Sequence, residues 1–308
     1  EEGIARVFGT GAGLSSSTPI GGGCINQCSC LELTDGKKLF CKKNGMELSG
    51  MFHAEAQGLL AMRRVSQRVD GPRIPEPIAL LQGQGYQYLL LEWISPGRQG
   101  SASLLGEQLA RFHAAGVGAE ELPCVDGQYS DRQGWGFPFD NFIGRTPQIN
   151  SWRGSWAEFF GDCRLGYLVG LLKKAGLADK TMLVLWDKLR KHLAEYLPEP
   201  EDASLLHGDL WSGNYMTDQS GQPVLYDPAV YVGDHEADLA MMQLFGNPVP
   251  AFWEAYRANF KLDKEYPRRR EIYNLYHLMN HLLLFGRGYH SAVIHSLHGI
   301  LDRPVIFP

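Results

Sequence analysis

Short runs of alternating hydrophobic and polar residues mark the first third of the chain. The predicted strands cover residues 15–20, 27–33, 38–42, 78–82 and 86–93. Asp35-Gly36 lies between the second and third runs, and Gly83-Gln84-Gly85 lies between the last two. Such turn residues between β-type runs are typical of hairpins, because glycine adopts the positive φ that tight turns require. The pattern therefore predicts an antiparallel sheet.

The spacing of hydrophobic residues then changes to the helical period. Predicted helices cover residues 47–64, 101–115, 156–175 and 178–196, a further helix ends at Phe245, and the rest of the chain is helical. In the first of these helices, Phe52, Ala56 and Leu59 fall near the 3.6-residue repeat and define a buried side. A sheet followed by mostly helical sequence predicts an α+β fold with a small sheet lobe and a larger helical lobe.

The most informative polar stretch spans residues 205–227 and reads LLHGDLWSGNYMTDQSGQPVLYD. Two apolar residues lead into His207-Gly208-Asp209, Asn214 follows, and a polar turn leads to a short strand that ends at Asp227. Phosphoryl transfer needs a carboxylate that takes the proton of the attacking hydroxyl, together with oxygen ligands for Mg²⁺. Asp209 fits the base, and Asn214 and Asp227 fit the metal ligands. Asp, Asn and Gly are also common in turns, so a solvated loop is the alternative.

A lysine and a glutamate upstream fit the same chemistry. Lys42 ends the third strand, and Lys43 points to the opposite face because side chains alternate along a strand. Glu55 lies three residues after Phe52, on the inward side of its helix, where a carboxylate is costly unless it is paired. We expect a Lys42–Glu55 ion pair that fixes a phosphate-binding ammonium. The alternative is that Glu55 reaches the helix edge and solvent.

Residues 21–26, Gly-Gly-Gly-Cys-Ile-Asn, lie between the first two strands. Successive glycines let backbone N–H groups approach phosphate oxygens without a Cβ in the way. This segment predicts a phosphate-binding loop, although a plain turn has the same composition. The candidate nucleotide-binding residues here are Gly22, Gly23, Cys24, Ile25 and Asn26.

Several of these segments together resemble the signatures of the fructosamine kinase (ketosamine-3-kinase) family. They are LLHGDLWSGN, LYDPAVYVGDHEADLAM, PIGGGCIN, LFCKKN, YLLLEWI and NHLLLFGRGY, in the family's order along nearly the whole chain. The resemblance implies a two-lobed protein-kinase-like fold related to aminoglycoside phosphotransferases, with ATP and Mg²⁺ as cofactors. It implies an N-terminal ATP-binding lobe over residues 1–94 and a C-terminal catalytic and acceptor-binding lobe over residues 95–308.

The resemblance also implies a hinge at the end of YLLLEWI. There the backbone carbonyl of Glu92 and the N–H of Ile94, on either side of Trp93, would bind the adenine edge. A buried strand that simply ends at a domain boundary is the alternative, and it is compatible with a hinge, since ligands favour interlobe clefts.

Candidate residues for the acceptor substrate are fewer. Trp211 lies two residues after Asp209, close enough to pack against a bound sugar. Asp234 and Glu236 are a helix cap and a first-turn acid, which could also attract an amine. His281 lies on a helix whose family counterpart borders the acceptor pocket. Six aromatic residues between positions 135 and 156 suit either a sugar face or plain packing.

Composition excludes several classes of partner. A net charge of −5 and a pI of about 6.1 argue against nucleic acid and anionic membranes. Arg268, Arg269 and Arg270 form the one basic run, interpreted as a solvated helix face. No run of 18 apolar residues exists, and the acidic N-terminus is unlike a signal peptide.

Six cysteines in 308 residues do not form a disulfide scaffold, so we expect a reducing cytoplasm. Cys24, Cys28, Cys30 and Cys41 lack the spacing of a zinc knuckle, and strand packing is the favoured interpretation. Cys24, within the glycine segment, is a candidate redox-sensitive thiol.

The resemblance implies an ATP-dependent kinase that phosphorylates a ketosamine, such as a fructosamine or ribulosamine, at the third carbon. The product would lose its sugar and free the protein or amine. Alternatives are a kinase for aminoglycosides, choline-like amines or free sugars, and a nucleotide-binding pseudokinase. A monomer or weak homodimer is expected.

Overall fold

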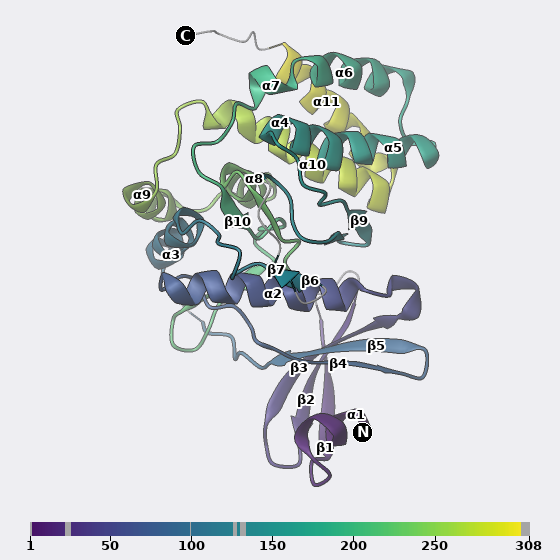
Figure 1. Ribbon diagram of the computed structural model, residues 1–308, viewed down its shortest axis with the longest axis vertical. Coiled ribbons are helices and arrows are strands. Elements are labelled where there is room, and N and C mark those ends of the chain that lie inside the picture. Colours follow the sequence, from purple (N-terminus) through teal and green to yellow (C-terminus); the bar gives the residue numbers. More distant parts are fainter. Residues whose placement is uncertain (1, 22–25, 99, 126–127, 130–133, 303–308) are drawn as a thin grey trace.

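The first third of the chain forms a five-stranded antiparallel sheet in the order β1-β2-β3-β5-β4 (Figure 1). The computed structural model describes residues 2–21, 26–98, 100–125, 128–129 and 134–302. The strands are β1 (Leu14–Ile20), β2 (Gln27–Leu33), β3 (Lys38–Gly45), β4 (Pro77–Gly83) and β5 (Tyr86–Glu92). All five predicted strands are therefore confirmed, and both predicted hairpins join neighbouring strands.

The alternation of side chains divides the sheet into two faces. On one face Leu39, Cys41 and Leu90 pack with Ile4 of α1 (Glu2–Phe8). Leu89 and Leu91 of β5 belong instead to the main core, which includes α2. Because each face has its own apolar partner, a shift of one residue in register would turn each set of side chains toward the wrong partner.

The helix α2 (Met51–Arg68) lies across the middle of the molecule, between the sheet and the remaining helices (Figure 1). It begins four residues later than predicted, because Met46–Leu48 forms a separate 3-10 turn, η1, and Gly50 has a φ of +87°. Phe52 and Leu59 are fully buried on its inner side. The predicted periodicity is thus correct, but the helix both begins and ends four residues later than predicted.

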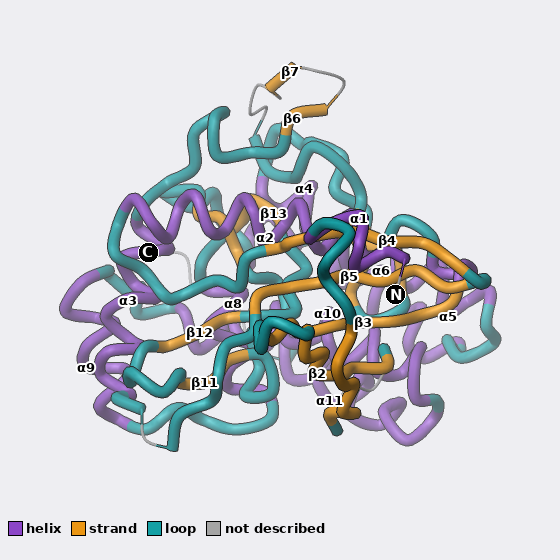
Figure 2. Tube along the Cα trace, turned by 90° about the horizontal axis from the view of Figure 1, so that it is seen from below, coloured by secondary structure: helices purple, strands orange, loops and turns teal. Residues whose placement is uncertain are grey.

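The rest of the chain is mainly helical. Its helices are α3 (Ala102–Ala114), α4 (Trp156–Phe159), η2 (Phe160–Gly166), α5 (Tyr167–Lys174), α6 (Lys180–Lys191), α7 (Leu193–Tyr196), α8 (Glu236–Leu244), α9 (Pro250–Asn259), α10 (Tyr266–Phe285), η3 (Arg287–Tyr289) and α11 (His290–Leu301). The helix predicted over residues 156–175 is interrupted by η2, a π-helical segment. Helix α10 packs against α5, α8 and α11, and α3 packs against α9. Figure 2 shows these helices behind the strands of the sheet.

Four short two-stranded antiparallel sheets lie within the helical part. They are β6 (Cys124–Val125) with β7 (Gln128–Tyr129), β8 (Asn141–Ile143) with β9 (Thr146–Gln148), β10 (Ser204–Leu206) with β13 (Tyr231–Gly233), and β11 (Tyr215–Thr217) with β12 (Pro223–Leu225). Strand β10 leads into His207, and β12 leads to Asp227. The pairs therefore bring the two ends of the stretch 205–227 together. The architecture is the predicted α+β class.

In the part of the chain that the structure describes, no helix is both long and apolar enough to cross a lipid bilayer.

Candidate active site

Lys42, Glu55 and Asp227 meet where the sheet faces the helical part. The Nζ atom of Lys42 lies 2.6 Å from Oε1 of Glu55 and donates a second hydrogen bond to Oδ1 of Asp227. Lys42 is 2% exposed, whereas the side chain of Asp227 is 43% exposed. The predicted Lys42–Glu55 pair is present, and it ties β3 and α2 to the end of β12. The ammonium of Lys42 thus contacts the buried carboxylate of Glu55 and the more exposed carboxylate of Asp227.

These charges hold Lys42 in its protonated form. Burial opposes the charged state, but the carboxylates of Asp227 and Glu55 outweigh it and raise the pKa of Lys42 above its usual value. For Glu55, burial raises the pKa, and Lys42 opposes that shift. Lys43 lies on the opposite face, as predicted, with Nζ 3.7 Å from the ring centroid of Tyr86.

The stretch after β10 folds into a tight loop around Asp209. The backbone N–H of Trp211 donates to the carbonyl of Asp209, and that of Asn214 donates to the carbonyl of Trp211. The side-chain amide of Asn214 donates to the Asp209 carbonyl at 2.8 Å and to its Oδ2 at 3.1 Å. The carboxylate of Asp209 is therefore fixed by the residue five positions later.

Burial raises the pKa of Asp209 to about 7. The hydrogen bond from Asn214 lowers it, while the negative charges of Asp227 and Asp238 raise it further. A carboxylate with a pKa near the ambient pH suits the role of a general base, because it is deprotonated yet still basic.

A buried carboxylate holds the backbone of this loop. Asp238 accepts hydrogen bonds from the backbone N–H groups of His207 at 2.7 Å and Gly208 at 2.8 Å. Its Oδ2 also lies 3.3 Å from Nε2 of His113, whose Nδ1 lies 2.8 Å from the hydroxyl of Tyr256. Asp238 therefore braces the backbone of the loop that carries Asp209.

Asp227 is held close to the loop by the residues on either side of it. His207 Nε2 lies 2.9 Å from the Tyr226 carbonyl, and the Ala229 N–H donates to the His207 carbonyl at 2.8 Å. Asp227 has a φ of +60°, a conformation rare for residues other than glycine and concentrated at functional sites. This backbone aims the carboxylate out of the end of β12.

The donor atoms near Asp227 suit Mg²⁺. The amide nitrogen of Asn214 faces Asp209, so its amide oxygen is the atom that remains for a cation. An amide oxygen and a carboxylate are hard oxygen donors, and Mg²⁺ is typically held by one or two carboxylates together with water and substrate phosphates. The described residues contain no group of three or more His, Cys, Asp or Glu that could hold a metal ion.

The glycine segment is described only in part. Gly22, Gly23, Cys24 and Ile25 lie outside the described residues, so the candidate redox role of Cys24 does too. The Oδ1 atom of Asn26 accepts a hydrogen bond from Nδ2 of Asn44 at 2.9 Å, which places Asn26 next to β3.

The predicted hinge continues from the end of β5. The N–H of Glu92 donates to the carbonyl of Glu76 at 2.9 Å, while its carboxylate binds Arg73. Trp93 donates from Nε1 to Ser95 at 3.1 Å, and Ile94 is buried. Their role in adenine binding stays a prediction.

Matches to known proteins identify the family. The model of the fructosamine kinase family matches residues 1–303. The chain belongs to the fructosamine kinase family. A protein named probable ketoamine kinase from Synechocystis sp. is 39% identical over 289 residues, covering 93% of this chain and 90% of that protein. The chloroplastic protein-ribulosamine 3-kinase of Arabidopsis thaliana is 37% identical over 278 residues, covering 89% and 79%.

A solved structure supports the same family. The crystal structure assigned as a fructosamine-3-kinase from Thermobifida fusca has a TM-score of 0.80 and 28% identity, covering 97% of this chain and 98% of that chain. The resemblance drawn from the sequence motifs is confirmed, and with it the two-lobed protein-kinase-like fold.

The acceptor candidates of this family member have different surroundings. Trp211 is 37% exposed beside Asp209, where a ligand can reach it. Asp234 accepts from the Glu236 N–H at 3.0 Å and from the Tyr273 hydroxyl at 2.6 Å. Glu236 is buried and accepts from Arg269 at 2.6 and 2.8 Å. Both carboxylates are bound internally, which favours a structural role, and their part in acceptor binding stays a prediction.

His281 lies in an aromatic cluster. Its ring centroid is 5.0 Å from that of Phe245, 5.3 Å from Phe285 and 5.1 Å from Tyr289. Phe245 and Phe285 are about half exposed, at 46% and 57%. Contact with an acceptor stays a prediction for His281.

The structure also decides two further expectations, on the aromatic residues between positions 135 and 156 and on the arginines at 268–270. Trp135, Phe137 and Trp156 are buried, so packing accounts for them. The interpretation of residues 268–270 as a solvated face is wrong, because Arg269 binds Glu236 and Arg268 lies 4.9 Å from the ring centroid of Tyr196.

The thiols of β2 and β3 pack as expected. Cys41 of β3 is buried, and Cys28 and Cys30 of β2 are partly buried. Burial raises the pKa of Cys41 to about 11, which keeps its thiol protonated and unreactive.

The sequence did not predict a buried polar network that binds the backbone carbonyls of Ala229 and Val230. Gln148 donates to the Ala229 carbonyl at 2.9 Å and to Asn141, and Asn141 donates to the Val230 carbonyl at 2.7 Å. Tyr276 donates to Gln148 at 2.7 Å. The isolated polar residues within the short strands β8 and β9 were the available signal.

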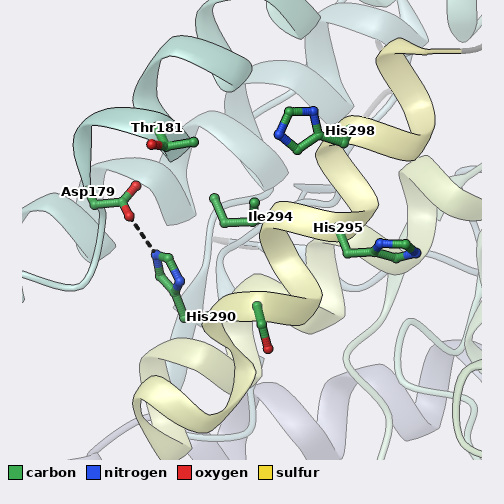
Figure 3. Close-up of a pocket in the computed structure, with 7 residues that line it drawn as sticks. Asp179, Thr181, His290, Ile294, His295 and His298 are labelled. Atoms are coloured by element: carbon green, nitrogen blue, oxygen red, sulfur yellow. Dashed lines mark ion pairs between the residues drawn. The ribbon is translucent and has the colours of Figure 1, made fainter.

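A surface hollow elsewhere belongs to neither lobe's predicted site. It lies between α6 and α11, where His290 pairs with Asp179, the N-cap of α6, at 3.2 Å (Figure 3). Figure 3 shows His295 pointing away from that pair. None of the predicted site residues lines this hollow.

Proposed function

We propose that this protein is an ATP-dependent kinase that phosphorylates a hydroxyl of a ketosamine at its third carbon. The observation that carries the proposal is the convergence of Lys42, Asp209, Asn214 and Asp227, from distant parts of the chain, in one site. The names of the relatives, a ketoamine kinase and a protein-ribulosamine 3-kinase, supply the substrate class.

Lys42 would bind the phosphates of the nucleotide, and Glu55 would keep the ammonium in place. Asn214 and Asp227 would hold Mg²⁺ through oxygen atoms. When bound, Mg²⁺-ATP supplies the phosphoryl group and neutralises the charge that develops during its transfer. The segment 21–26 and the hinge at Glu92, Trp93 and Ile94 would hold the phosphates and the adenine.

Asp209 would accept the proton of the acceptor hydroxyl. Its orientation is set by Asn214, and the backbone of its loop is held by Asp238. A base held in place before the substrate arrives avoids the entropic cost of orienting it during reaction. Trp211, exposed next to Asp209, would cover one face of the sugar.

Phosphorylation at the third carbon makes a ketosamine labile, so that the sugar is lost and the amine is released. The protein would therefore serve the deglycation of proteins or small amines. We propose a monomer or weak homodimer in the cytoplasm, divided into an ATP-binding lobe over residues 1–94 and a catalytic lobe over residues 95–308. Unpaired Cys28, Cys30, Cys41 and Cys163 support a reducing compartment.

A panel of acceptors tests the proposal. Purified protein with Mg²⁺-ATP is offered fructosyl-lysine, ribulosyl-lysine, an aminoglycoside, choline and free fructose, and ADP release and phosphorylated product are measured. We expect turnover with the ketosamines, and none with a ketosamine that lacks the third-carbon hydroxyl. Preference for an aminoglycoside or choline would move the protein to another acceptor class. ATP binding without any turnover would indicate a pseudokinase.

A further inference from the structure

Two backbone segments, one that leads from α2 into β4 and one that leaves β5 for the helical part, run beside the β11–β12 hairpin. On one side, the Arg73 N–H donates to the Pro223 carbonyl at 2.8 Å, and the Leu225 N–H donates to the Arg73 carbonyl at 3.0 Å. On the other side, the Gly97 N–H donates to Thr217 at 2.7 Å. The hairpin that leads from Asn214 to Asp227 thus lies between the segment entering β4 and the segment leaving β5.

The side chain of Arg73 joins the hinge to this hairpin. Its Nη2 donates to Oε1 of Glu92 at 2.7 Å, with Nε 3.2 Å from the same oxygen. Its Nη1 donates to Oδ2 of Asp218, in the hairpin turn, at 2.9 Å. One planar guanidinium therefore binds a carboxylate at the end of β5 and another between β11 and β12.

At the hairpin end, Asp218 is held by several further hydrogen bonds. Oδ1 of Asp218 accepts from the N–H groups of Ser220 at 2.9 Å and Gln222 at 3.0 Å, and from the Ser220 hydroxyl at 2.6 Å. Gln222 in turn accepts from Gln108 of α3 at 3.0 Å. Although burial opposes its charge, these bonds and Arg73 hold the pKa of Asp218 at about 2, so it stays ionised.

We propose that Arg73, through Glu92 and Asp218, is a positioning residue that keeps the hinge in register with the hairpin carrying Asn214 and Asp227. The inference rests on the proposed function for its effect on catalysis. If the adenine is held at the hinge and the metal at the ends of the hairpin, one Mg²⁺-ATP molecule must reach both sites. The distance between the hinge and the hairpin therefore has to match the length of the nucleotide. Arg73 sets that separation before the nucleotide binds.

The fork geometry of arginine is essential to this role. A lysine places one point charge and binds one carboxylate at a time, so Arg73→Lys keeps the charge but loses the bridge. A matched control is Arg63→Ala. Arg63 also approaches Glu92, at 3.9 Å, and binds Ile74 and Glu76, but these contacts all lie within residues 74–92, away from the hairpin.

The first measurement is steady-state kinetics of the wild type, Arg73→Lys, Arg73→Ala and Arg63→Ala. For Arg73→Lys we expect KM for ATP to rise roughly tenfold, with kcat and KM for the acceptor within about threefold of wild type. Arg63→Ala should leave KM for ATP unchanged. A uniform loss of kcat with unchanged KM for ATP in Arg73→Lys would overturn the proposal, and so would an Arg73→Lys protein that matches Arg63→Ala.

The second measurement needs no nucleotide and no activity. The Gln219 N–H donates to the Ser95 carbonyl at 3.1 Å. Amide hydrogen exchange at Gly97, Gln219 and Leu225 therefore reports the backbone hydrogen bonds between the hairpin and the two segments beside it. In Arg73→Lys these amides should exchange at least about fivefold faster, while core amides of α10 keep their rate. Equal rates at the three positions would refute the bridge. If Arg73→Lys shows the exchange effect but the wild type has no kinase activity, the proposed function fails and the bridge stands.

Discussion

Asp238 and Gly208 are joined by a 2.8 Å hydrogen bond from the backbone N–H of Gly208 to a fully buried carboxylate. Asp238 lies 30 residues after Gly208, in the first turn of α8, yet it also accepts from the backbone N–H of His207. Since Asp209 follows directly, the orientation of the predicted base depends on an acid that touches no substrate.

Asp238→Asn is expected to lower both activity and stability. An amide can present its NH₂ group to a backbone N–H, so at least one of the three donors around position 238 loses its acceptor. Leaving buried donors unpaired costs about 1–3 kcal/mol each. We expect kcat to fall on the order of 100-fold, because a misplaced base forfeits much of its orientation advantage. Kinetics and urea unfolding measure the two effects.

Asp187→Asn is the matched control for that substitution. Asp187 is exposed on α6 and pairs with two neighbours on its own helix, Arg190 and Lys191. Its replacement should change stability by less than about 0.5 kcal/mol and leave kcat unchanged. Wild-type kcat in Asp238→Asn would contradict the bracing role.

Lys42 and Lys43 offer a test within one strand. Lys42→Met should reduce turnover on the order of 100-fold or more, because it removes a preorganised charge from the phosphates. Lys43→Met, on the opposite face over Tyr86, should retain turnover within about threefold. ATP titration and single-turnover kinetics compare the two variants. Equal losses in both would mean that charge, not position, matters.

Sequence patterns predicted the parts of the site that depend on local spacing. The period of two in β3 distinguishes Lys42 from Lys43, and the helical period of α2 places Glu55 inward. Asp209 and Asn214 lie five residues apart in one loop, so their contact is local as well. In each case the orientation of the side chain depends on its nearby residues, so it can be predicted from the local sequence.

Partners that are distant in sequence could not be predicted in this way. Arg73 meets Asp218 from 145 positions away, and Arg269 meets Glu236 from 33 positions away. Nothing in the run of three arginines distinguishes Arg269, whose side chain is 11% exposed, from a solvated residue. Glu236 had a plausible local role as a first-turn acid, and only the tertiary contact shows that its charge is already neutralised.

The pH dependence of the reaction should report Asp209. Its pKa of about 7 lies above the ordinary 3.8, so the free enzyme holds a proton on the base below neutral pH. The kcat/KM for a ketosamine should therefore rise tenfold per pH unit below about 7 and level off above it. A profile flat from pH 5.5 to 8.5 would exclude Asp209 as the base.

The same shift predicts a stability effect of opposite sign. Because the folded state binds the Asp209 proton more tightly than the unfolded state, stability falls as pH rises from about 4 to about 7. Asp209→Asn removes this titration. We expect the variant to be inactive, and its unfolding free energy relative to wild type to be higher at pH 8 than at pH 5. Urea unfolding at the two pH values measures the difference.

The last prediction concerns the metal. Asn214→Ala removes the amide oxygen proposed for Mg²⁺ and also the hydrogen bonds to Asp209. We expect the Mg²⁺ concentration for half-maximal rate to rise at least about tenfold, with partial recovery of kcat at high Mg²⁺, since Asp227 remains as a ligand. Chelation of Mg²⁺ should stop turnover without lowering the melting temperature of the nucleotide-free protein. Asp227→Ala removes the negatively charged ligand of the two, so this variant should show no recovery at any Mg²⁺ concentration. If Asn214→Ala lost rate equally at all Mg²⁺ concentrations, its contribution would be confined to orienting Asp209.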